Sequence, residues 1–174
     1  MKRITLLMPV LAFLSSLALA QDVKRNFDPT VNFSKFTTYK WVNVDGSPQS
    51  DSIVDRQIKS DVDADLASKG LTKVDDDNAT LYVAYQVATQ QQRQINWFNS
   101  GGAWGWGGGM GSATTSIVEV GTLAIDFYDP STKLMIWRGV GTKTLDPSSN
   151  PEKNMSRLNK AVEKILKDFP PKSK

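Results

Sequence analysis

The chain has 174 residues, of which 21 are basic and 18 acidic, and it contains neither histidine nor cysteine. These absences exclude disulfide cross-links, Ser-His-Asp and Cys-His catalysis, and the usual zinc ligands. Carboxylate chemistry, Ser-Lys chemistry and oxygen-ligated metals remain chemically open. Because no motif for any of them is present, we expect no catalytic set, no metal site and no cofactor.

The first 20 residues have the order of a secretory signal peptide. Residues 1–3 include two basic side chains, residues 4–19 are mostly apolar, and Ala18-Leu19-Ala20 fits an A-x-A cleavage site. The apolar run is shorter than the ~20 residues that a membrane-spanning helix needs, and Pro9 interrupts it. We predict cleavage of residues 1–20, export to the periplasm or the medium, and no transmembrane helix in the mature chain.

The predicted mature chain, residues 21–174, is expected to form a single domain. Its 154 residues are close to the commonest domain size. Loss of Lys2 and Arg3 leaves 19 basic against 18 acidic side chains, so the net charge falls from +3 to +1. Basic residues gather only in the tail, at Lys164, Lys167, Lys172 and Lys174. Nucleic acid is therefore not an expected partner.

The first half of the mature chain alternates strand and helix patterns. A β-rich stretch at 36–44 ends at the turn residues 45–48. An amphipathic helix follows between the capping residues 50–52 and Gly70, with apolar residues at every fourth position: Val54, Ile58, Val62 and Leu66. A short edge strand is predicted at 71–74 and a half-buried strand at 80–89.

The second half indicates a β-hairpin and a final helix. Alternating residues predict a strand at 114–128, a turn at 129–132 and a returning strand at 133–140. A helix is expected from Asn150-Pro151 to the break at Pro170-Pro171. The predicted fold class is α+β, a two-layer sandwich in which one mainly antiparallel sheet carries two amphipathic helices on one face.

Between these halves lies a Gly-rich segment that is dotted with tryptophan. We expect a flexible loop at about 97–113, after a glutamine-rich stretch that begins at Gln90. Large apolar side chains on such a loop either pack on the protein's own surface or contact a membrane interface, a sugar face or a protein partner. The candidate contact residues are Trp97, Phe98, Trp104, Trp106 and Met110.

Acidic residues are the remaining candidates for chemistry. Asp61, Asp63 and Asp65 have a period of two on the predicted helix, which indicates a solvated face rather than one cluster. Asp126 interrupts an apolar strand, and Glu119 and Arg138 are its candidate partners. We predict a cross-strand ion pair on a solvated sheet face rather than a catalytic acid.

Several segments together are similar to one known family. They are F-x-x-Y-x-W at 36–41, GTLAIDFYDP at 121–130, LMIWRG at 134–139 and KILKDFPP at 164–171. The chain resembles the bacterial envelope family called domain of unknown function 4136, and the similarity covers nearly the whole mature chain. It implies location and fold but no activity. Asp126, Trp137 and Arg138 are candidate motif residues.

Many members of that family look like lipoproteins with a cysteine at the mature N-terminus. Here Gln21 occupies that position, so no lipid anchor is expected. The leading hypothesis is a non-enzymatic envelope-associated protein that contacts membrane, glycan or protein through the Gly/Trp loop. One alternative is a glycan hydrolase that uses carboxylates such as Glu119, Asp126 and Asp129. Another is a scaffold that oligomerises through its sheet edges.

Overall fold

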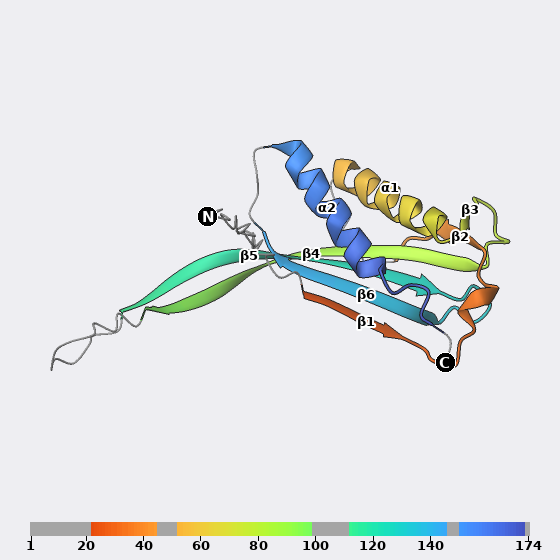
Figure 1. The fold of residues 1–174 in the computed structure, drawn as a ribbon, viewed down its shortest axis with the longest axis horizontal. Coiled ribbons are helices and arrows are strands. Elements are labelled where there is room, and N and C mark those ends of the chain that lie inside the picture. Colours follow the sequence, from red (N-terminus) through yellow and green to blue (C-terminus); the bar gives the residue numbers. More distant parts are fainter. Residues whose placement is uncertain (1–21, 45–51, 99–111, 146–149, 173–174) are drawn as a thin grey trace, which may run out of the picture.

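A computed structural model describes residues 22–44, 52–98, 112–145 and 150–172 (Figure 1). The signal-peptide prediction and residues 99–111 lie outside the described residues. The elements in chain order are β1 (Asp22–Phe27), the 3-10 turn η1 (Phe33–Lys35), β2 (Thr38–Trp41), α1 (Ser52–Ser68), β3 (Thr72–Lys73), β4 (Leu81–Phe98), β5 (Ser112–Tyr128), β6 (Met135–Thr144) and α2 (Pro151–Leu166).

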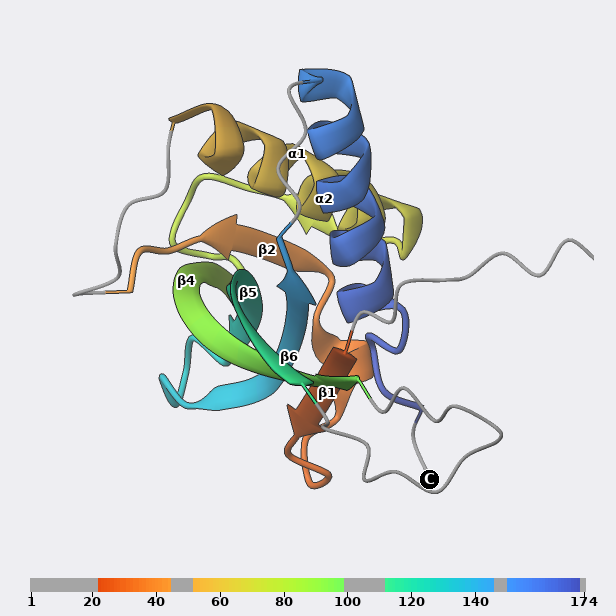
Figure 2. The same cartoon turned by 90° about the vertical axis from the view of Figure 1, so that its left-hand side faces the viewer.

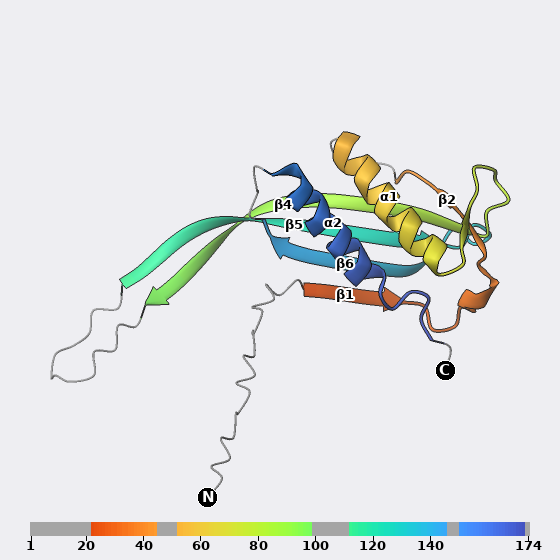
Figure 3. The same ribbon diagram turned by 45° about the horizontal axis from the view of Figure 1, so that its top comes forward.

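The strands form one six-stranded sheet in the order β1-β6-β5-β4-β2-β3. β1–β6, β6–β5 and β5–β4 pair antiparallel, whereas β4–β2 and β2–β3 pair parallel. Both helices lie across the same face of this sheet (Figure 3). The α+β class with two helices on one face of a largely antiparallel sheet is therefore confirmed.

The helices form where the apolar spacing predicts them. α1 buries Ile58, Val62 and Leu66, and α2 buries Val162, Ile165 and Leu166, because residues three and four apart share one face of a helix. These side chains meet a sheet face that is built from alternate strand residues. The fully buried side chains there include Leu81, Val83, Ile125, Phe127 and Trp137.

Both ends of α2 are held by specific contacts. Asn150 caps the start, since its side chain accepts a hydrogen bond from the backbone N–H of Lys153. At the other end, Arg25 of β1 donates through Nε to the carbonyl oxygen of Ile165 at 2.8 Å and pairs with Asp168 at 2.9 Å. These contacts fasten the outer strand to the last helix and satisfy a carbonyl that the helix itself leaves unpaired.

The strands differ from the sequence prediction mainly at β1, at β2, at the end of β4 and at β6, which covers 135–144 instead of 133–140. β1 was not predicted, because three of the six residues of DVKRNF are charged and its only apolar contribution to the core comes from Val23. β2 covers only 38–41 of the predicted 36–44. β4 continues through the glutamine-rich stretch to Phe98, nine residues beyond the predicted end at Thr89. Its backbone is paired throughout by β5, so the polar side chains need no buried face.

The prediction that Asp61 lies on a solvated face of α1 is wrong. This residue is 8% exposed, and its Oδ1 accepts hydrogen bonds from Gln57 on α1 and from Asn159 on α2. Asp63 points to the sheet edge and accepts from the Tyr39 hydroxyl and the Trp41 indole, each at 2.8 Å. These bonds tie the helix to β2. Sequence period alone could not show them, because the partners lie on another element.

Candidate functional site

The β4–β5 hairpin extends far beyond the rest of the sheet (Figures 1 and 3). β2 pairs with β4 only at residues 81–83, and β6 pairs with β5 only from Val120 onward. Residues 91–98 and 112–119 therefore form a two-stranded ribbon, here called the distal hairpin, and no other described strand covers its edges. Figure 2 views the molecule from this end.

Two candidate contact residues lie on this ribbon. Trp97 and Phe98 are the last residues of β4, opposite Ala113 and Ser112 in the register. The expected loop at 97–113 is therefore shorter at both ends, because β4 continues to Phe98 and β5 begins at Ser112. Trp104, Trp106 and Met110 lie outside the described residues. The covalent chain nevertheless joins them to the far end of the distal hairpin.

The predicted ion pair between Asp126 and Arg138 is confirmed, but the predicted solvated setting is wrong for Asp126, which is fully buried. Arg138 donates to both carboxylate oxygens, from Nε and from Nη2, each at 2.6 Å. Gln86 adds a weaker hydrogen bond at 3.3 Å. The Asp126 side chain is 0% exposed whereas that of Arg138 is 39% exposed. Glu119 is seven residues away and projects from the opposite face of β5, so it is not a partner.

The surroundings of this pair are consistent with a structural role. Ala84, Asp126 and Arg138 lie opposite one another on three neighbouring strands, on the sheet face without helices. Burial, and after it the nearby Asp126 carboxylate, raises the pKa of Tyr128 on the same face. The pair neutralises a charge that the sheet has taken out of water, and its two parallel bonds fix the β5–β6 register.

Trp137, the third motif residue, belongs to the core. It is 1% exposed and stacks on Phe127 with a centroid distance of 5.0 Å. Phe169, which follows α2, meets its ring edge-on at 5.4 Å. Gly139 has no side chain beneath this indole, and a Cβ there would lie 2.4 Å from the Trp137 Cη2 atom. The W-R-G motif is thus explained by packing.

The third carboxylate of the hydrolase alternative, Asp129, is held in its ionised form. Lys35 donates to its Oδ2 at 2.7 Å, and Ser131 donates to its Oδ1 from both the hydroxyl and the backbone N–H. The Lys35 bond, followed by those of Ser131, lowers the pKa of Asp129 to about 2. A glycosidase acid needs a raised pKa, so this geometry does not support that alternative.

Replacing Asp129 with asparagine should flatten the acid branch of the stability profile. Because the folded pKa of about 2 lies below the unfolded value, the carboxylate stabilises the protein above about pH 4 and loses this effect as the pH falls towards 2. Since Lys35 is half-exposed, we expect about 1 kcal/mol of pH-dependent stability to disappear in Asp129→Asn. Urea unfolding at several acidic pH values measures it, and equal pH slopes for both proteins would contradict the assignment.

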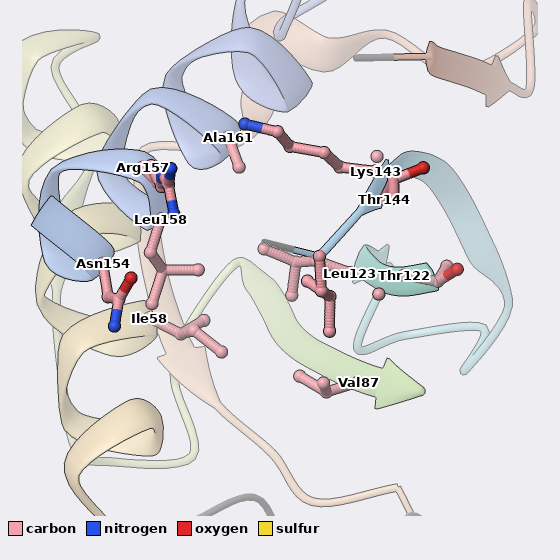
Figure 4. A pocket seen from close by; sticks show the side chains of 13 residues that line it. Ile58, Val87, Thr122, Leu123, Lys143, Thr144, Asn154, Arg157, Leu158 and Ala161 are labelled. Atoms are coloured by element: carbon pink, nitrogen blue, oxygen red, sulfur yellow. The ribbon is translucent and has the colours of Figure 1, made fainter. Parts of the chain in front are cut away.

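A cavity of about 330 Å³ lies where α2 diverges from the sheet, next to the base of the distal hairpin (Figure 4). Its walls come from both helices and from β4, β5 and β6. Sequence reasoning missed it because the lining residues are far apart in the chain and share no motif. The residues around it are Ile58, Val87, Gly121, Thr122, Leu123, Gly141, Lys143, Thr144, Leu145, Asn154, Arg157, Leu158 and Ala161.

In residues 22–44, 52–98, 112–145 and 150–172, acidic side chains do not gather in threes as a metal site would require. Over the same ranges, neither helix has the length and apolar character to cross a bilayer.

The sequence comparison decides the family. The model described as Domain of unknown function (DUF4136) matches residues 23–171. The chain belongs to this family. The resemblance inferred from the sequence is thereby confirmed, and the match extends from β1 to the residues after α2. No curated protein matches the chain in sequence.

Solved structures share the fold of this DUF4136 chain at low identity. A PDZ domain protein from Parabacteroides distasonis matches with a TM-score of 0.58 and 12% identity, over 87% of this chain but only 36% of that protein. A PelC dodecamer from Paraburkholderia phytofirmans matches with a TM-score of 0.52 and 14% identity, over 84% of this chain and 95% of PelC. These likenesses show the fold alone.

In this DUF4136 chain two of the motif segments therefore belong to the β5–β6 part of the fold. The segments at 121–130 and 134–139 bring together the Asp126–Arg138 pair, the Trp137 stack and the Asp129 turn. Each of these groups has a partner within the fold. The distal hairpin and the cavity beside its base have no such structural role assigned to them.

Proposed function

We propose that the protein is an exported, non-enzymatic, envelope-associated protein that contacts an envelope component through its distal hairpin and the attached Gly/Trp segment. The observation that carries the proposal is the hairpin itself. It projects from the helix-covered part of the sheet, and its last described residues are Trp97 and Phe98 (Figure 1). A two-stranded ribbon is marginally stable alone, so such a projection is better explained by a contact than by packing.

Charge and chemistry support the same proposal. Two of the three carboxylates of the hydrolase alternative, Asp126 and Asp129, are engaged by Arg138 and Lys35. Tryptophan side chains suit a membrane interface, a sugar face or a protein surface, because the ring is apolar and the indole N–H is polar. The component contacted is therefore a membrane surface, a glycan or a protein of the envelope.

Vesicle flotation tests the membrane form of the proposal. Residues 21–174 are mixed with anionic vesicles, and tryptophan fluorescence is followed in the floated fractions. If the contact is a membrane, the intact chain floats with a blue-shifted emission, and a variant with Trp97, Trp104 and Trp106 changed to alanine floats at least about tenfold less. A matched control is Leu134→Ala, which removes a 65%-exposed apolar side chain elsewhere.

If neither protein floats, the same pair of variants is tested against envelope glycan and against envelope proteins by cross-linking. Deletion of residues 97–111 tests the proposal as a whole. If the deletion variant keeps every binding activity and every envelope-stress phenotype of the intact chain, the proposal is overturned.

A second candidate function, an oligomeric envelope scaffold, is favoured by the open edges of the distal hairpin. Uncovered edges are templates for strand pairing between copies. PelC, which shares the fold, is a dodecamer in its solved structure. If the present chain is a scaffold, light scattering should give an oligomer both for the intact chain and for the chain without residues 97–111. A monomer in both cases would remove this alternative.

A further inference from the structure

The cavity beside the hairpin base has the composition of a ligand site. Its volume of about 330 Å³ lies at the lower end of the range of ligand pockets, roughly 300–1,000 Å³. The walls are mostly apolar, with Ile58 from α1, Val87 and Leu123 from the sheet, and Leu158 from α2. In Figure 4 these side chains point towards a common space between the helices and the strands.

The polar part of the lining is one-sided in charge. Among the 13 lining residues, Lys143 and Arg157 are basic and none is acidic. Lys143 has neither an ion pair nor a side-chain hydrogen bond with any residue that the structure describes. Figure 4 shows its side chain extending from β6 towards Ala161 on α2. The structure thus places an ammonium group beside an apolar space.

From this combination we infer that the cavity binds a single-chain anionic amphiphile, an acyl chain that ends in a carboxylate. The chain lies against Val87, Leu123 and Leu158, where burial of methylene groups favours binding. The carboxylate meets the Lys143 ammonium, with Arg157 on the same rim. A small anion would leave the apolar walls unused, and a neutral hydrocarbon would leave the Lys143 ammonium without a counter-charge.

The small side chain of Ala161 leaves space on the α2 side of the cavity. Gly121 and Gly141 line the cavity on the sheet side, and Ala161 is the smallest side chain that α2 contributes. Ala161 is the better position for filling the cavity, because leucine is also a strong helix former and need not disturb α2. Ala64 on α1 is exposed and gives a matched Ala-to-Leu change away from the cavity.

Calorimetry with decanoate and dodecanoate, below their micelle concentrations, tests the inference on residues 21–174. We expect one molecule bound per chain, with dodecanoate about fifteenfold tighter than decanoate, since each of the two added methylenes gives about fourfold. Decanol should bind several-fold more weakly than decanoate. Lys143→Gln should weaken decanoate binding by about three- to tenfold without changing decanol binding. Lys24→Gln, on the helix-free face, is its control and should have no effect.

Ala161→Leu should abolish binding of both carboxylates, whereas Ala64→Leu should leave it unchanged. Thermal unfolding of the variants confirms that they fold. The inference is overturned if decanoate and dodecanoate do not bind, if their affinity is independent of chain length, or if a folded Ala161→Leu protein binds as well as the original. Deletion of residues 97–111 should leave this binding intact, which separates it from the function proposed for the distal hairpin.

Discussion

Replacing Arg138 with alanine should destabilise the protein by about 3–5 kcal/mol, one of the two largest effects expected of a single change. The Asp126 carboxylate is 0% exposed and accepts both of its short hydrogen bonds from this guanidinium. Without it, a buried charge would keep only the 3.3 Å contact with Gln86. Since a domain of this size has about 5–15 kcal/mol of stability, much of the total would be lost. Urea unfolding of both proteins measures the difference.

The matched control removes both charges together. In the double variant Asp126→Leu with Arg138→Met, no ion remains buried, and we expect at least half of the lost stability to return. If the single Arg138→Ala change costs less than about 1 kcal/mol, Asp126 is already accommodated by other groups and the structural role assigned to the pair is wrong.

Replacing Trp137 with alanine should cost about 3–5 kcal/mol. The indole is 1% exposed, stacks on Phe127 of the sheet and meets the ring of Phe169, after α2, edge-on. Its removal leaves a large cavity where the two layers meet, and the rigid strand backbone cannot close it. Chemical denaturation gives the value, with Leu134→Ala at the exposed β5–β6 turn as the low-cost control.

Gly139 provides an independent check of this packing. A methyl group there meets the Trp137 indole at 2.4 Å and the Ile165 Cγ2 atom at 2.6 Å, so Gly139→Ala should cost about 1–3 kcal/mol. In the Trp137→Ala background the first clash is gone, and the same methyl should cost less. Strictly additive effects would mean that the two residues do not share the space described here.

The helices and the central strands could be predicted from the sequence because their signals are local. α2 has an Asn150-Pro151 start, a continuous apolar stripe and a proline stop, all within one short segment. The alternation of residues 123–127 likewise indicates a strand buried on one side. In each case the residues that give the signal are also the residues that fill the core.

The missed elements depend on partners rather than on their own residues. β1 is held by its pairing with β6 and by Arg25, not by apolar alternation. The glutamine-rich part of β4 has no buried face to give a period of two, and β5 alone determines its conformation. For the same reason, only part of the candidate site could be predicted. The sequence indicated the pairing of Asp126 with Arg138, which lie on adjacent strands of a hairpin. Lys143 and Ala161 come together through the packing of α2 on the sheet, which no local pattern shows.

The bond between Arg25 and α2 has a consequence for the order of folding. It joins residues 140 positions apart, and β1 pairs with β6, which also lies in the second half of the sequence. Of the described elements, β1 is synthesised first and α2 last, so the contact between Arg25 and α2 cannot form until α2 has been made. Closing so long a loop is slow, because its entropy is lost before the contacts form. The domain is therefore completed late, after its entire chain has been made.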